Sequence, residues 1–139
     1  MRVRRGVIAV GMALVLADCG PPGPITLDGV TIMRHKFLTE SPAALLDGAT
    51  IEFRDGCVGT DVLPTGQFEP IIWPPTASLA HQGVELVLVV DGLLIHHLDA
   101  VSVGGGEVND LAFVEQLSGP IPEACRANLY WLAGEVSRP

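Results

Sequence analysis

Polar and apolar residues alternate along much of this chain, with the period of two that is typical of β-strands. Residues 50–55 show the alternation most simply, because Ile51 and Phe53 fall on one face and charged residues fall on the other. Three further stretches rich in β-branched and aromatic residues are strand candidates: 30–38, 66–73 and 128–136. The stretch at 66–73 ends at two prolines, which cannot continue a hydrogen-bonded ladder.

The clearest predicted element is a hairpin over residues 84–98. Two apolar runs flank Asp91-Gly92, a pair that is strongly typical of a two-residue hairpin loop. A loop of that length sets the register of the strands. The expected cross-strand pairs are Val90–Leu93, Leu88–Ile95 and Leu86–His97. Both faces of the hairpin are largely apolar, which predicts a central position covered on both sides.

Turn signals separate the predicted strands. Asp-Gly also occurs at 28–29, 47–48 and 55–56, and glycine adopts a positive φ at little cost. Three consecutive glycines at 104–106 are expected to form a loop. Short strands separated by turns at this spacing predict an all-β fold, a single antiparallel β-sandwich of about seven strands.

Residues 107–117 fit two different patterns. Val108, Leu111, Val114 and Leu117 have the spacing of a helix face. In the same segment, Leu111, Phe113 and Glu115 alternate as they would in a strand. The residues alone leave helix and strand both open here.

The N-terminus has a pattern of its own. Arg2, Arg4 and Arg5 precede an apolar run that is shorter than the roughly 20 residues a bilayer span requires. This order is typical of a secretory signal peptide, which we expect over 1–18. Cys19 resembles the lipid-modified cysteine of a bacterial lipoprotein, although Asp18 stands where Gly, Ala or Ser is usual. Cleavage without lipidation and an uncleaved anchor are the alternatives.

Cleavage before Cys19 removes 18 of the 139 residues and leaves 121, enough for one domain. The Gly/Pro tract at 20–24 is typical of a spacer. We therefore expect a lipidated Cys19 with a Gly/Pro tether over 19–29, and one domain over 30–139. The expected location is the bacterial cell envelope, on the periplasmic or outer-surface side, with the lipid as the contact to the membrane. Without lipidation the protein is expected to be secreted.

The mature chain is acidic. The formal net charge is −8, and it becomes −10 once the three leader arginines and Asp18 are removed. Such a surface repels phosphate backbones, which excludes nucleic acid as a partner, and it also opposes docking on anionic lipid headgroups.

Two cysteines, Cys57 and Cys125, remain after the leader. An even pair in an exported domain predicts a disulfide. The alternative is a metal site with two thiolates, but neither cysteine has a second ligand at zinc-site spacing.

Several motifs, taken in order, resemble those of carboxypeptidase regulatory-like domains. Residues 46–53 resemble the family's Gly-Ala-Thr-Val strand, 60–68 its turn and following strand, and 89–95 its Asp-Gly hairpin. Residues 101–111 resemble its closing strands, so the resemblance spans about 46–114. Leu94 replaces the usual aromatic after Asp-Gly, and the cysteine pair and the tail from 118 lie outside the pattern.

The resemblance implies a transthyretin-like, Ig-like β-sandwich that serves as an accessory or binding module. It also favours strand over helix at 107–114.

Few residues suggest chemistry. His96 and His97 would point to opposite faces of a strand and so could not hold one ion together, and no metal or cofactor is predicted. Four glutamates, at 52, 69, 85 and 115, are scattered with nothing to select a pair, and no catalytic residue is predicted. Glu85 lies diagonal to His96 across the hairpin, which predicts an ion pair. Trp73, Tyr130 and Trp131 are candidates for stacking on sugar rings.

The predicted function is non-enzymatic: a structural or protein-binding module that meets another envelope protein or a polysaccharide. A carbohydrate-binding module is the alternative, and it requires Trp73 and Trp131 to be exposed on one surface. A metal-dependent hydrolase is a third hypothesis. It requires two histidines close enough to share a metal, chosen from His35, His81, His96 and His97.

Overall fold

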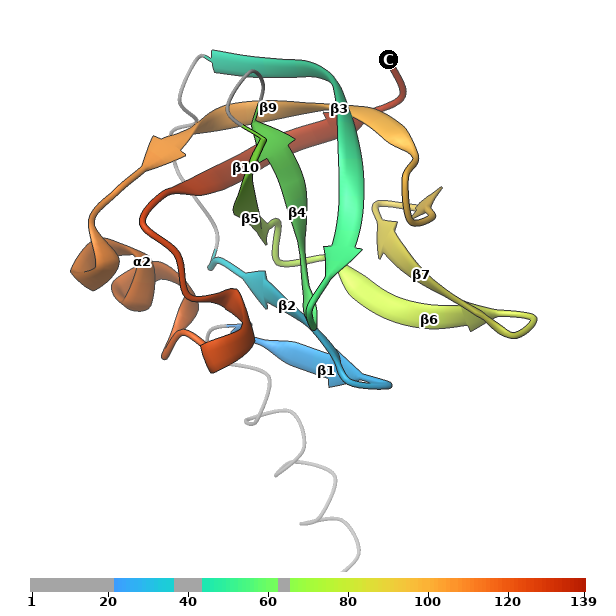
Figure 1. The fold of residues 1–139 in the computed structure, drawn as a ribbon, viewed down its shortest axis with the longest axis horizontal. Helices are drawn as coiled ribbons and strands as arrows, with labels where there is room; N and C mark the ends of the chain where they lie inside the picture. The colour runs from blue at the N-terminus through green and yellow to red at the C-terminus, as the bar shows by residue number, and fades with distance from the viewer. Residues whose placement is uncertain (1–21, 37–43, 63–65) are drawn as a thin grey trace, which may run out of the picture.

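The computed structural model describes residues 22–36, 44–62 and 66–139 (Figure 1). The expected signal peptide and Cys19 lie outside the described residues. Within these three ranges, no helix has the length and hydropathy that crossing a bilayer requires.

Strands make up most of the described chain, which confirms the all-β fold. The strands are β1 (Ile25–Leu27), β2 (Val30–Arg34), β3 (Ala44–Arg54), β4 (Cys57–Val62), β5 (Gln67–Trp73), β6 (Ser78–Gln82), β7 (Glu85–Val90), β8 (Leu93–Ile95), β9 (Ala100–Val108) and β10 (Tyr130–Ser137). One α-helix, α2 (Leu111–Ser118), and a 3₁₀ turn (Glu123–Cys125) lie between β9 and β10. β1 falls within the segment expected to be a tether, and it pairs with β2.

Six strands close into a barrel in the order β2-β4-β3-β9-β10-β5 and back to β2 (Figure 1). The expected sandwich with antiparallel strands throughout is wrong, because β2–β4, β2–β5 and β5–β10 are parallel pairs. The cause lies in β5. Its first half pairs with β4, and its second half pairs with β10 and β2. A strand that changes partners in this way joins the two edges of the sheet.

The hairpin at Asp91-Gly92 is confirmed, with Val90 opposite Leu93 and Leu88 opposite Ile95. It belongs to a separate three-stranded sheet, β6-β7-β8, and not to the centre of the main sheet. Leu88, Val90 and Ile95 are fully buried in the same core as the barrel interior, so this small sheet packs on the barrel. The third expected pair is wrong. β8 ends at Ile95, before His97, so Leu86 has a strand partner only on the β6 side, where it pairs with His81.

Three of the four Asp-Gly pairs form the expected tight turns, with positive φ at Asp28, Asp55 and Asp91. The fourth, at 47–48, lies inside β3, where the register against β9 shifts between Leu46 and Ala49. It is therefore a bulge and not a turn. The loop expected at 104–106 is also wrong, since these glycines lie within β9. A Cβ at Gly105 would collide with the carbonyl oxygen of Leu132, so glycine allows β9 and β10 to approach closely.

The segment at 107–117 follows the helical pattern from Leu111 onwards. Asp110 caps α2, because its Oδ1 accepts hydrogen bonds from the amides of Ala112 (3.0 Å) and Phe113 (3.3 Å). Val114 and Leu117 are buried, as their spacing predicts. The strand favoured by the family resemblance ends at Val108 and is wrong beyond it.

The disulfide between Cys57 and Cys125 is confirmed, with the two Cα atoms 5.3 Å apart. It joins β4 to the 3₁₀ turn and lies in a second core beneath α2, which also contains Met33, Ile72 and Val114. Alternation along β5 explains the two cores. Ile71 and Trp73 face the barrel interior, while Ile72 between them faces the second core.

Replacing both cysteines with alanine should lower the free energy of unfolding by about 4 kcal/mol, because the disulfide closes a loop of 68 residues in the unfolded chain. Urea unfolding with and without reductant measures the loss. The native protein should lose stability on reduction and the C57A/C125A variant should not. Equal stability of the oxidised native protein and the variant would contradict the prediction.

Candidate functional site

The three aromatic residues proposed for sugar stacking do not form a binding surface. Trp73 and Tyr130 are fully buried, and Trp131 is 5% exposed. Both tryptophans lie in the main core, and Tyr130 lies in the second core, where its hydroxyl accepts a hydrogen bond from the amide of Ala127 (2.9 Å). The expectation of exposed aromatics is wrong, because a chain with seven aromatics uses these three to fill its interior.

The four histidines have separate partners. His35 is buried, and its ring nitrogens lie 2.7 Å from two backbone carbonyls, those of Lys36 and Ala133. His81 pairs with Asp28, and His97 Nδ1 accepts a hydrogen bond from the amide of Phe53 (3.0 Å). Across the described ranges, no three His, Cys, Asp or Glu side chains come together as metal ligands would.

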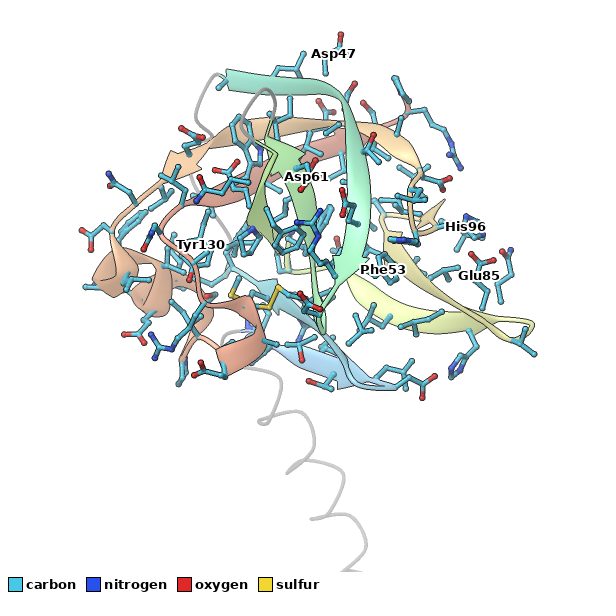
Figure 2. All side chains as sticks on the ribbon, in the orientation of Figure 1. Asp47, Phe53, Asp61, Glu85, His96 and Tyr130 are labelled. Carbon is cyan, nitrogen blue, oxygen red and sulfur yellow. A yellow bond between two sulfur atoms is a disulfide. The ribbon has the colours of Figure 1, made fainter. Side chains whose placement is uncertain are left out.

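His96 lies in a polar cluster at the edge of the small sheet. Asp99 accepts a hydrogen bond from the His96 amide (2.8 Å) and lies 3.1 Å from its Nδ1. The amide hydrogen bond is the main reason that the pKa of Asp99 is lowered. Nε2 lies 2.7 Å from Gln82 Oε1 and 3.9 Å from Glu85, the residue expected to pair with it (Figure 2). Both ring nitrogens are thus occupied by neighbouring side chains.

A hollow of about 450 Å³ lies between β3 and β4. Its lining consists of residues 46–50, Glu52, Thr60 and Asp61. Figure 2 shows Asp47 and Asp61 at the same end of the barrel, where β3 begins and β4 ends. Three of the lining side chains are carboxylates, so we call this feature the acidic hollow.

Asp47 is held at the rim of the acidic hollow by the bulge in β3. Its Oδ1 accepts a hydrogen bond from the Ser102 hydroxyl (2.8 Å), and the same hydroxyl lies 3.4 Å from the amide of Gly48. A serine on β9 therefore fixes a carboxylate on β3. The Asp-Gly pair at this position is visible in the sequence, but its role as a bulge depends on pairing with β9.

One arginine connects the other two carboxylates of the hollow. Arg54 Nη2 lies 2.7 Å from Glu52 Oε1, and it lies 2.8 and 2.9 Å from the two oxygens of Asp61, with the hydrogen bond running to Oδ2. The guanidinium also stacks over Phe68, 5.0 Å from the ring centroid. The hydrogen bond to Glu52 is the largest reason that the pKa of Arg54 is raised. Three carboxylates and one guanidinium leave the hollow with a net negative charge.

A buried carboxyl lies next to the hollow. Thr60, which lines the hollow, is the cross-strand partner of Glu69 on β5, and Glu69 is only 2% exposed. Burial raises the pKa of Glu69 to about 7, and a hydrogen bond and charge repulsion with Glu107 of β9 add to the shift. The sequence nominated Glu69 among scattered glutamates but missed Glu107. The available signal was the position of Glu69 within an apolar run, which indicates a buried carboxyl.

The arrangement can do two things chemically. The acidic hollow offers carboxylate oxygens to a cationic or hydrogen-bond-donating group. The carboxyl of Glu69 is enclosed, and its pKa of about 7 lets it gain or lose a proton near neutral pH. In comparisons with protein-family models, curated proteins and solved structures, the chain has no significant match.

Glu69 should make the domain less stable as the pH rises. The unfolded chain has the ordinary glutamate pKa of 4.5, whereas the folded value is about 7, so the stability present below pH 4.5 is lost as the pH rises through 7. Relative to the native protein, Glu69→Gln should raise the free energy of unfolding at pH 8 by about 3 kcal/mol, at about 1.4 kcal/mol per pKa unit. At pH 4 the two proteins should be nearly equal.

Thermal and urea unfolding of both proteins from pH 4 to pH 8 measure this difference. Glu115→Gln, which changes an exposed glutamate on α2, is the matched control and should follow the native curve. Stability curves for Glu69→Gln and the native protein that run parallel with pH would refute the prediction.

Proposed function

We propose that this protein is a non-enzymatic lipoprotein of the bacterial cell envelope, anchored through Cys19, whose barrel is a protein-binding module. The observation that carries the proposal is the Cys57–Cys125 disulfide, buried beneath α2. Disulfides persist in oxidising compartments, which is where the basic and apolar leader would send the chain.

Binding is favoured over catalysis by how the polar side chains are used. The side chains of His81, His96 and His97 each contact a neighbouring group of the domain, and the carboxyl of Glu69 is enclosed. The acidic hollow is open and carries excess negative charge, which suits a partner surface bearing lysine or arginine.

Membership of the carboxypeptidase regulatory-like family is a further part of the proposal. Its support is the order of motifs over 46–114, since β3, β5 and β9 lie where those motifs predict strands. The parallel pairs and α2 depart from the sandwich that this family implies. The proposed binding role does not depend on the family.

Expression of the full chain in a bacterium tests the anchor. Mass spectrometry of the membrane fraction should find acyl mass on a peptide that begins at Cys19. Cys19→Ser should shift the protein to the soluble fraction, while Asp18→Ala should leave it in the membrane with equal or more complete acylation. A native product that is unmodified and soluble would refute the anchor.

Removing the charge of Asp47 from the rim of the acidic hollow should weaken binding to a basic partner. With envelope proteins captured on the immobilised protein, Asp47→Asn should lower the yield of salt-sensitive partners several-fold, because it removes one of three carboxylates from the hollow. Glu115→Gln removes the same charge from the exposed face of α2 and should leave capture unchanged. Equal losses for the two variants would indicate non-specific attraction and contradict the proposed surface.

A further inference from the structure

Arg34, at the end of β2, hydrogen-bonds to four backbone carbonyls from two separate parts of the chain. Its Nη2 donates to Pro22 (2.9 Å) and its Nε donates to Gly23 (3.0 Å). Nη1 donates to Pro75 (3.3 Å) and Ala77 (3.5 Å), in the segment between β5 and β6. The guanidinium thus joins the first described residues to the body of the domain.

The residues that follow are also held to the domain. Gly23 lies beside the end of α2, since a Cβ at this position would be 3.8 Å from the carbonyl oxygen of Ser118. From Ile25 onwards the chain is β1, paired with β2, and the hydroxyls of Thr26 and Thr31 are 2.8 Å apart. Any free spacer after Cys19 therefore ends at Pro22.

Very little chain then separates the anchor from the barrel. Only Gly20 and Pro21 lie between Cys19 and Pro22. Three residue steps span at most about 11 Å. The polar headgroup layer of one leaflet is itself roughly 5–8 Å thick. A lipid on Cys19 would consequently hold the part of the barrel near Pro22 at the membrane surface.

The acidic hollow lies at the other end of the molecule. Figure 1 shows β1 at the end opposite the beginning of β3, and Figure 2 shows Asp47 at that far end. The β1 end carries exposed Asp28 and Asp55 in two adjacent turns, linked by a hydrogen bond from Thr31 to the carbonyl of Gly56 (2.8 Å). Anionic headgroups repel these carboxylates, so the short anchor, and not charge attraction, holds this end near the bilayer.

We propose that Arg34 locks residues 22–23 to the barrel, so that the lipid-anchored protein holds its β1 end at the membrane and presents the acidic hollow away from it. The inference rests on the proposed lipidation of Cys19. Arg34 is a positioning residue here, because it acts on the chain and not on a ligand.

Fluorescent probes at the two ends of the barrel test the orientation. In separate variants, Thr26→Cys and Leu45→Cys introduce one thiol each at exposed strand positions, near the anchor and near the hollow respectively. Labelling is specific, since Cys57 and Cys125 are bonded to each other and Cys19 would carry lipid. The full chains are purified from bacterial membranes and reconstituted into phosphatidylcholine vesicles that contain a headgroup-labelled quencher lipid.

The expected result is quenching at least several-fold stronger at residue 26 than at residue 45. Arg34→Ala should reduce this ratio towards one, because the chain after Cys19 gains length and freedom. Inserting ten Gly/Ser residues between Gly20 and Pro21 should reduce the ratio in the same way while leaving Arg34 and the fold intact. This second variant keeps the test decisive if Arg34→Ala fails to fold.

The outcomes separate the two proposals. Equal quenching at the two positions in acylated native protein would overturn the orientation and leave the lipid anchor standing. An unchanged ratio in a folded Arg34→Ala variant would overturn the role of Arg34. Absence of acyl mass on Cys19 would overturn the anchor, and the orientation with it.

Discussion

The fold depends on one strand, β5, that changes partners along its length. Up to Pro70 it pairs antiparallel with β4, and from Ile71 it runs parallel to β10 and β2. Two local features permit the change. A Cβ at Gly59 would collide with the carbonyl oxygen of Glu69, so glycine lets β4 and β5 approach closely, and Pro70 has no amide hydrogen to offer a ladder. The closed barrel and both cores follow from this strand.

The same strand links the fold to the candidate site. Because side chains alternate along β5, the register that sends Ile71 and Trp73 into the barrel also sends Glu69 inward, beside Thr60. A carboxyl is thereby enclosed at the point where the strand leaves β4. The acidic hollow lies on the neighbouring strands, so the charged surface and the buried carboxyl share one part of the sheet.

Local chemistry in the sequence predicted part of the local structure. Asp91-Gly92 set the hairpin register, and two cysteines in a chain expected to be exported indicated their bond. The spacing of Val114 and Leu117 fits α2, but the alternating pattern of the same segment left a strand equally open. The acidic composition also indicated a negatively charged surface, but the positions of its carboxylates could not be read from it.

The sequence could not reveal which distant segments meet. Parallel pairing of β5 with β10 joins strands some sixty residues apart, and no turn motif in the sequence indicates this pairing. The glycines at 104–106 suggested a loop, but glycine is needed there because the carbonyl of Leu132 leaves no room for a Cβ at Gly105. Leu132 belongs to another strand, so the sequence near the glycines does not show this constraint. Trp73 and Trp131 suggested a ligand surface for the same reason, since burial depends on which elements cover them.

Barrel closure also depends on the last strand of the chain, β10. β10 is the neighbour of both β9 and β5, and it is synthesised after both of them. Until it docks, two long strands keep unpaired backbone edges, which are sites of aggregation. Pairings between segments so distant in sequence form slowly. A nascent chain that stays unfolded until β10 has emerged avoids exposing these edges.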